Sequence, residues 1–215
     1  MSRQKSLDFI RATGVVAIMR ADDSEQLLDA AAAIREGGVN VIEVTMTTPG
    51  ALSVIQKAVA KYGEDVLFGA GTVLDPESAR AAILAGAGFV VAPSLNRGVI
   101  EICNRYSVPV MPGAYTPTEI LTAWECGADM VKVFPASVGG AELIKALKAP
   151  LPQIDLVPVG GVDLDTTADF IRAGSAAVGV GSSLINKKLL DSRDFSTLTD
   201  LARRFVEEVR SGREE

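Results

Sequence analysis

A lysine stands in the middle of one of the most apolar stretches of the chain, at residues 130–134. If this stretch is a strand, the alternation of side chains places Met130, Lys132 and Phe134 on one face. Burial penalises the ammonium form of a lysine and lowers its pKa, and the free amine attacks carbonyl carbons to form a Schiff base. A lysine that extends to solvent at a strand end, or that pairs with a carboxylate, fits the same residues equally well.

A glutamate occupies a similar setting in an earlier apolar stretch, residues 39–45, which contains Glu43. A carboxyl group among apolar side chains has a raised pKa and can exchange protons near neutral pH. An ion pair with Lys132 or Arg20 is the alternative. The two interpretations are compatible, because a catalytic carboxylate often lies beside the lysine that it serves.

Glycines follow two late apolar stretches of the chain, as Gly160 and Gly161 and as Gly181 before Ser182 and Ser183. Late loops of a strand–helix barrel commonly hold phosphate, because backbone N–H groups there point at the anion. A glycine pair alone is usually only a turn. Two such loops after successive strands favour a phosphate site, to which a serine hydroxyl adds a donor.

The sequence contains no histidine. That absence excludes Ser-His-Asp and Cys-His nucleophile systems and histidine-based zinc sites. Proton transfer must then rely on carboxylates, lysine, tyrosine, cysteine or water. Cys103 and Cys126 fall in helix-like segments and are expected to be buried free thiols, since two cysteines do not make the disulfide framework of a secreted protein.

The elements that must position these residues alternate along the chain, as eight short apolar runs, each followed by a segment with helical periodicity. Near-continuous apolar runs are typical of parallel strands buried on both faces. Eight such units in about 200 residues predict a (β/α)8 TIM barrel, and we expect residues 1–215 to form a single domain of this α/β class with a short N-terminal helix. The runs lie at residues 15–19, 39–44, 66–70, 89–92, 108–111, 130–134, 154–159 and 176–180.

A doubly wound open sheet is the alternative architecture, because the same local signals can build one. The dinucleotide fingerprint G-x-G-x-x-G that usually opens its first helix is absent after residues 15–19, and no linker or shift in composition indicates a second domain. The barrel is therefore the preferred prediction.

A barrel places its functional residues at the C-terminal ends of its strands. Charged or conformationally special residues stand at these positions in every unit, which supports the barrel. The candidate functional residues are therefore expected to lie together at the C-terminal end of the barrel. Arg20, after the first run, could pair bidentately with a carboxylate or phosphate, or form a surface salt bridge. In chain order the strand ends carry Arg20, Glu43, Gly71 and Thr72, Pro93, Pro112 and Gly113, Lys132, Gly160 and Gly161, and Gly181 and Ser182.

Composition narrows the possible partners. The chain carries 27 acidic against 21 basic residues, a net charge of -6, which argues against nucleic acid as a ligand. The longest apolar run, residues 81–93, is interrupted by Gly86 and Gly88 and is shorter than the ~20 residues of a membrane span. No signal peptide is indicated at the N-terminus, so a cytoplasmic location is expected.

The chain resembles the 2-keto-3-deoxy-6-phosphogluconate (KDPG) / 4-hydroxy-2-oxoglutarate (KHG) aldolases from about residue 14 to residue 209. Lys-x-Phe-Pro and Gly-Ala-Gly-Thr are its most specific pieces. The segments that carry the resemblance are GGVNVIEVT (37–45), GAGTV (69–73), MPG (111–113), TPTE (116–119), VKVFPA (131–136), GGV (160–162) and GVGS (179–182).

The resemblance implies a class I aldolase, in which Lys132 forms the imine and Glu43 moves protons. It implies cleavage of a 2-keto-3-deoxy-6-phospho sugar acid, of the gluconate or galactonate series, to pyruvate and glyceraldehyde 3-phosphate, and of 4-hydroxy-2-oxoglutarate to pyruvate and glyoxylate. It further implies no metal, no organic cofactor and a homotrimer. Substrate would be bound by Arg20, Thr72 and Pro93 at the pyruvate end, by Phe134 beside the imine, and by Gly160, Gly161, Gly181 and Ser182 at the phosphate.

Two departures from the family pattern concern the substrate. Relatives often read Glu-Val-Thr-x-Arg-Thr, whereas Thr47 stands here at the arginine position, so that Arg20 is left to supply the charge. Gluconate-type relatives often read Pro-Thr-Gly-Gly, whereas this chain has Val159 before its two glycines, as in the galactonate branch. The stereochemistry of the substrate at C4 stays open.

Two other classes of function remain as alternatives. A phosphate-binding barrel that isomerises or decarboxylates without an imine would use Lys132 only as an electrostatic group. A non-catalytic barrel kept for assembly would have no need of Glu43 and Lys132, and their presence together argues against it.

Overall fold

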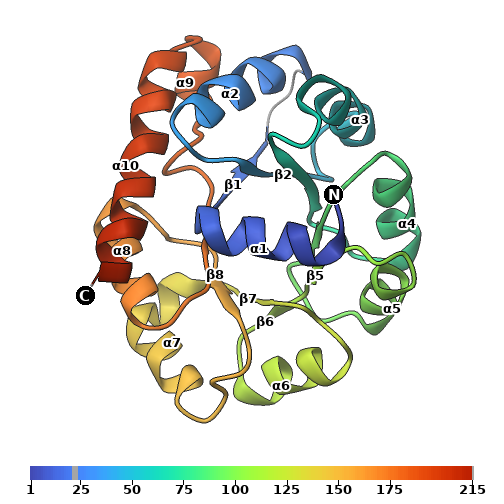
Figure 1. The fold of residues 1–215 in the computed structure, drawn as a ribbon, viewed down its shortest axis with the longest axis vertical. Helices are drawn as coiled ribbons and strands as arrows, with labels where there is room; N and C mark the ends of the chain where they lie inside the picture. The colour runs from blue at the N-terminus through green and yellow to red at the C-terminus, as the bar shows by residue number, and fades with distance from the viewer. Residues whose placement is uncertain (21–23, 215) are drawn as a thin grey trace.

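The computed structural model describes residues 1–20 and 24–214, which form an α/β fold around a curled, fully parallel sheet system (Figure 1). The strands lie at the centre of the molecule and the helices surround them. The strands are β1 (Val15–Met19), β2 (Val41–Thr45), β3 (Leu67–Gly71), β4 (Val90–Val91), β5 (Val110–Met111), β6 (Gly113–Ala114), β7 (Val131–Val133), β8 (Leu156–Pro158) and β9 (Val178–Val180).

Several of the helices begin where a polar side chain caps them. The Asp75 side chain accepts from the Ser78 N–H, and Thr116 and Glu119 form a reciprocal capping box. None of the helices in the described residues is long and apolar enough to cross a membrane. They are α1 (Arg3–Thr13), α2 (Ser24–Glu36), α3 (Ala51–Tyr62), α4 (Pro76–Leu84), α5 (Arg97–Arg105), α6 (Pro117–Glu125), α7 (Gly140–Lys148), α8 (Leu164–Arg172), α9 (Lys187–Asp191) and α10 (Phe195–Glu214), with a 3-10 turn at Ala136–Val138.

All eight apolar runs of the sequence contain a strand, which confirms that part of the prediction. An additional short strand, β6, lies just beyond the fifth run, and Pro112 alone separates it from β5. The short N-terminal helix is also present, as α1.

The strands are assigned to two parallel sheets and not to the continuous eight-stranded sheet that was predicted. Six strands follow the order β5-β4-β3-β2-β1-β9, and three follow β6-β7-β8. The breaks have a local cause: Pro112 and Pro158 have no N–H to donate to a sheet ladder. Across the second break, an isolated parallel bridge joins Val159 to Gly179.

Two apolar clusters fill the interior, one inside the curl and one between the strands and the surrounding helices. Their separation follows the alternation of side chains along each strand: Val41 points inward, whereas Ile42 and Val44 pack against helices. We call the first set the inner cluster. It consists of Leu7, Ile10, Val16, Ile18, Val41, Leu67, Phe89, Val91, Met111, Met130, Val157, Val159 and Ala177.

The helix α1 closes the N-terminal end of the curl, where Figure 1 shows it lying across the strands. Leu7 and Ile10 from this helix belong to the inner cluster. Arg3 holds the helix in place, because its guanidinium donates to both carboxylate oxygens of Asp129, at 2.9 and 2.8 Å, and also to Asn104. This helix leaves the opposite, C-terminal ends of the strands uncovered.

Replacing Arg3 by alanine is expected to lower the free energy of unfolding by about 1–3 kcal/mol, because the largely buried Asp129 carboxylate loses its charged donor. Urea unfolding measures this loss. Lys5→Ala is the matched control on the same helix: its partner Glu64 is exposed, so stability should scarcely change. Equal effects of the two substitutions would show that the Arg3 contact does not hold α1.

Candidate active site

A cavity of about 430 Å³ opens at the C-terminal ends of the strands. Strands β1, β2, β7 and β9, together with the loops after β3, β4, β8 and β9, contribute to its wall. All ten residues that the sequence analysis proposed for the site line this one cavity: Arg20, Glu43, Thr72, Pro93, Lys132, Phe134, Gly160, Gly161, Gly181 and Ser182.

Lys132 lies at the centre of β7 with its side chain turned inside the curl, on the same face as Met130 of the inner cluster. Only 6% of the residue is exposed, so it does not extend to bulk solvent. Burial lowers the pKa of the Lys132 amine, while the Glu43 carboxylate raises it and the Arg20 guanidinium lowers it further. The neutral, nucleophilic form is thereby favoured relative to a surface lysine.

Glu43 lies at the centre of β2, paired with Ile18 of β1 on one side and with Gly69 of β3 on the other. It is 2% exposed, and this burial raises the pKa of its carboxyl, against the opposing charges of Lys132 and Arg20. Among the described residues, no ion pair with an N–O distance within 4.0 Å joins Glu43 to Lys132 or Arg20. The carboxyl group is therefore available to a third molecule in the cavity.

Phe134 covers the amine from the mouth of the cavity, with its ring centroid 5.0 Å from the Lys132 Nζ. A protonated nitrogen at this distance gains a cation–π attraction. Gly160 packs under the same ring: a Cβ at this position would lie 3.0 Å from it. Gly160 also has φ of 89°, in the left-handed region, so that both space and backbone conformation require glycine there.

Backbone donors also line the cavity. Within the described part of the chain, the N–H groups of Gly161, Ser182 and Ser183 have no hydrogen-bond acceptor in the protein. Gly161 closely approaches the 3-10 turn after β7, since a Cβ there would lie 2.4 Å from the Cβ of Ser137. Free N–H groups on adjacent loops suit an anion such as phosphate.

Arg20, Thr72 and Pro93 line the remaining wall. Arg20 is exposed at the end of β1, and its charge lowers the pKa of both Glu43 and Lys132. Thr72 has φ of 57°, a left-handed conformation that is uncommon for a β-branched residue and marks a constrained site. Pro93 is approached closely by Gly113, where a Cβ would lie 2.2 Å from the Pro93 carbonyl group.

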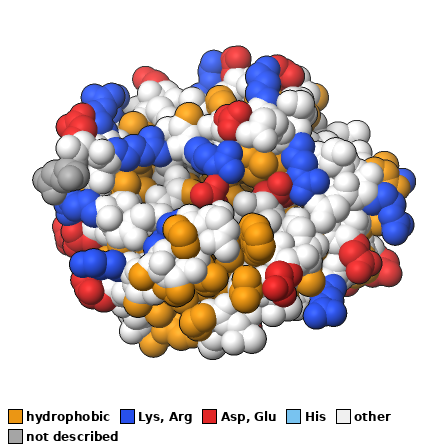
Figure 2. Space-filling model, turned by 60° about the horizontal axis from the view of Figure 1, so that its bottom comes forward, with side chains coloured by type: hydrophobic (Ala, Val, Ile, Leu, Met, Phe, Trp, Pro, Cys, Tyr) orange, Lys and Arg blue, Asp and Glu red, His pale blue; other side chains and the backbone are white. Residues whose placement is uncertain are grey.

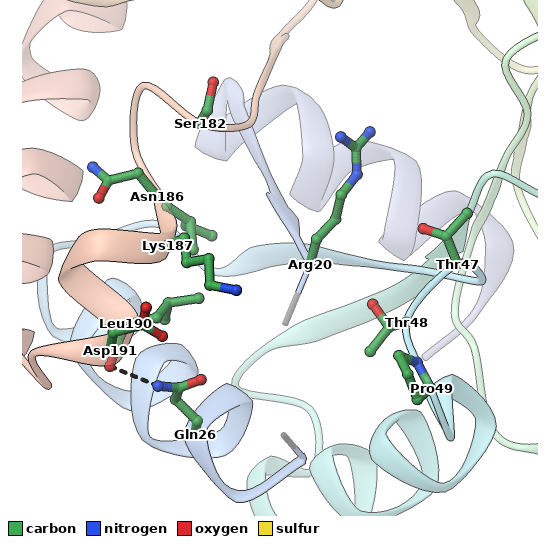
Figure 3. A pocket seen from close by; sticks show the side chains of 11 residues that line it. Arg20, Gln26, Thr47, Thr48, Pro49, Ser182, Asn186, Lys187, Leu190 and Asp191 are labelled. Atoms are coloured by element: carbon green, nitrogen blue, oxygen red, sulfur yellow. Dashed lines mark hydrogen bonds between the residues drawn. The ribbon is translucent and has the colours of Figure 1, made fainter. Parts of the chain in front are cut away.

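A second cavity, of about 460 Å³, adjoins the first and shares Arg20, Ser182 and Ile185 with it. Figure 3 shows its wall, with Thr47 and Thr48 on one side and α9 on the other. Thr47, at the position where relatives often have arginine, thus lines this outer cavity and not the one that holds Lys132. Arg20 is the cation that borders both.

Four apolar or small residues of the wall were not predicted from the sequence, namely Ile18, Val162, Gly179 and Ile185. The period of two along a strand could have identified Ile18 and Gly179, which stand two positions before Arg20 and Gly181 and share their faces. Val162 and Ile185 lie in loops, where no periodic signal exists. Their contribution depends on how the loops fold over the strand ends.

The donor set is suited to carbonyl chemistry by an amine and a carboxyl group. Among the described residues, no three His, Cys, Asp or Glu side chains are grouped so that they could hold a metal ion. Cys103 is buried, and burial raises the pKa of its thiol to about 12, so it is not a nucleophile.

Burying two ionisable groups inside an apolar enclosure lowers the free energy of unfolding. Replacing both by uncharged groups of similar size, in the double variant Glu43→Gln/Lys132→Met, is expected to raise the free energy of unfolding by about 1–4 kcal/mol, because neither charge must then be desolvated. Urea unfolding at neutral pH measures it, with each single variant as a reference. A double variant less stable than the wild type would mean that the pair holds the fold together.

Comparisons with known proteins point to one family. A family model described as KDPG and KHG aldolase matches residues 7–201. The 2-dehydro-3-deoxy-6-phosphogalactonate aldolase of Escherichia coli (strain K12) is 39% identical over 171 residues, which cover 79% of this chain and 83% of that protein. The 2-dehydro-3-deoxy-phosphogluconate aldolase of Treponema pallidum (strain Nichols) is 36% identical over 206 residues, or 95% and 96% of the two chains.

A solved structure is similar in fold over nearly the whole chain. It is the crystal structure of KDPG aldolase from Legionella pneumophila with pyruvate captured at low pH as a covalent carbinolamine intermediate. The TM-score is 0.86 at 27% sequence identity, and the match covers 92% of this chain and 96% of that one.

Proposed function

The chain belongs to the KDPG and KHG aldolase family, and we propose that Lys132 is its Schiff-base lysine and Glu43 its proton carrier. The substrate would be a 2-keto-3-deoxy-6-phospho sugar acid, cleaved to pyruvate and glyceraldehyde 3-phosphate, with 4-hydroxy-2-oxoglutarate as a second substrate that yields pyruvate and glyoxylate. The observation that carries the proposal is the placement of a buried amine and a buried carboxyl group on the wall of one cavity.

The reaction begins when the neutral Lys132 amine attacks the C2 ketone. The carbinolamine that forms loses water to give a protonated imine, with Glu43 as the group that supplies and removes protons. The Legionella relative, with pyruvate held as a covalent carbinolamine, supports this step by analogy. The lowered pKa of Lys132 favours it, because only the unprotonated amine is a nucleophile.

Cleavage follows from the imine. Glu43 as carboxylate takes the proton of the C4 hydroxyl, the C3–C4 bond breaks, and its electron pair moves into the enamine as the aldehyde leaves. Glu43 then returns the proton to C3, and water hydrolyses the imine to release pyruvate and restore the amine. The raised pKa of Glu43 suits a group that must both accept and donate a proton near neutral pH.

The two ends of the cavity would hold the two charged ends of the substrate. Arg20, Thr72 and Pro93 would bind the pyruvate portion, with Arg20 opposite the carboxylate. The phosphate would accept hydrogen bonds from the backbone at Gly160, Gly161, Gly181 and Ser182 and from the serine hydroxyl. Fixing both ends places the scissile bond over the imine, so that positioning supplies part of the rate.

We further propose that the two sheets form one closed eight-stranded barrel, with β5 and β6 as a single strand broken at Pro112. The Asp129 N–H donates to the Val110 carbonyl at 3.2 Å across the first break, and the Ala176 N–H donates to the Leu156 carbonyl at 2.9 Å across the second. Hydrogen bonds on both sides support closure. Closure is what would bring Glu43 of one sheet and Lys132 of the other to face the same cavity.

We also propose that the chain assembles as a homotrimer, as the family resemblance implies. Apolar side chains gather on the face that carries α6 and α7 (Figure 2). Trp124 of α6 is half-exposed, and Val138, in the turn after β7, is 72% exposed. Light scattering should give the mass of a trimer, and Trp124→Glu should reduce it by placing a charge in that apolar face. A monomeric wild type at micromolar concentration would contradict the proposal.

Borohydride reduction in the presence of pyruvate tests the imine. The wild type should gain a covalent adduct that peptide mapping places on Lys132, and Lys132→Arg should gain none and lose at least ~10³-fold in cleavage, since it cannot form the imine. A wild type that cleaves substrate without an adduct would support the non-imine alternative. Absence of both adduct and pyruvate exchange would favour the non-catalytic one.

The same trapping has a predicted pH dependence. Trapping rises as Lys132 loses its proton, so its midpoint should lie below the value of 10.5 for an unperturbed lysine. The Glu43 carboxylate raises the pKa of Lys132, so Glu43→Gln should move the midpoint to lower pH. A midpoint that stays in place or moves upward would mean that the Glu43 carboxylate does not raise the pKa of the amine. Repeating the cleavage assay with both C4 epimers would settle which sugar series Val159 favours.

A further inference from the structure

Gly71, the last residue of β3, faces the carboxyl group of Glu43 across the two neighbouring strands. In the parallel register, Glu43 pairs with Gly69 and Thr45 pairs with Gly71. The Glu43 side chain therefore extends along the sheet towards Gly71. A Cβ at Gly71 would lie 1.6 Å from the Oε1, 2.1 Å from the Cδ and 2.5 Å from the Cγ of Glu43.

We infer that Gly71 is a positioning residue: its missing side chain leaves the volume in which the Glu43 carboxyl group is held. The inference rests on the proposed role of Glu43 in proton transfer. Backbone conformation does not explain the glycine, since Gly71 is not among the residues with positive φ. All three atoms nearest to the added Cβ belong to Glu43.

A second glycine on the same face of β3 shows a different use of the same residue type. Side chains alternate along this strand: Leu67 belongs to the inner cluster, whereas Phe68 and Ala70 pack against the helices. Gly69 and Gly71 therefore both face inward. A Cβ at Gly69 would lie 2.5 Å from the ring of Phe89, a residue of the inner cluster. Gly69 makes room for packing, and Gly71 makes room for the carboxyl group.

A methyl group at position 71 must displace the Glu43 carboxyl group, because an overlap of this size involves its Oε1, Cδ and Cγ together. The cavity is the side towards which the carboxyl group can move. The charged groups that act on Glu43 there are Lys132 of β7 and Arg20 after β1, and each favours the carboxylate form, as does water. Displacement would thus lower the pKa of Glu43 and move its oxygens away from the C4 hydroxyl of the substrate.

The first experiment compares Gly71→Ala with Gly69→Ala in the cleavage reaction. Gly71→Ala should lower kcat by about 10²-fold with little change in KM, because misplacement of a reacting group by ~1 Å has effects of this size. Since cleavage needs the carboxylate form, the acidic limb of the kcat profile should move to lower pH. Gly69→Ala should reduce stability but leave the acidic limb in place. Identical pH profiles for the two variants would overturn the inference.

The second experiment measures stability and does not depend on catalysis. Gly71→Ala should lower the thermal unfolding midpoint when Glu43 is present and much less in the Glu43→Ala background, where the overlapping atoms are gone. Equal losses in both backgrounds, or failure of the Gly71→Ala/Glu43→Ala protein to fold, would overturn the contact. If instead Glu43→Ala alone leaves cleavage intact, the proposed role of Glu43 fails while this stability test still stands.

Discussion

The burial of one amine and one carboxyl group inside the apolar curl is the constraint around which the rest of this molecule is organised. Lys132 and Glu43 lie at the centres of their strands, where an apolar side chain would stabilise the fold more. Burial moves their pKa values towards each other, the lysine downward and the glutamate upward. The enclosure causes both shifts, and the charge of Arg20 beside it lowers the pKa of both groups.

Much of the fold could be predicted because it follows from local patterns in the sequence. The apolar runs predicted the positions of all eight principal strands. Because barrels carry their functional residues at the C-terminal ends of strands, residues as distant in sequence as Arg20 and Ser182 could be assigned to one cavity. The breaks at Pro112 and Pro158 also had a local signal, since proline cannot donate to a ladder. The prediction of a barrel rested on the count of eight strand–helix units and did not use that signal.

Features that depend on strand register could not be predicted in this way. The overlap between a Cβ at Gly71 and the Glu43 carboxyl group exists only because β2 and β3 pair with Glu43 opposite Gly69. A shift of the register would place another residue there, and the sequence of neither strand reveals the offset. The loop residues Val162 and Ile185 were not predicted for a related reason, because no periodicity governs where a loop crosses the strand ends.

The division of the strands between two sheets has a consequence for how the protein reaches its active form. Glu43 belongs to the six-stranded sheet and Lys132 to the three-stranded one, with β6 as the direct neighbour of β7. Either sheet could regain its own hydrogen bonds during renaturation and still present only one of these two residues. The rate at which enzymatic turnover recovers would then report the rate at which the two sheets join, whereas circular dichroism would report the secondary structure already formed within each sheet.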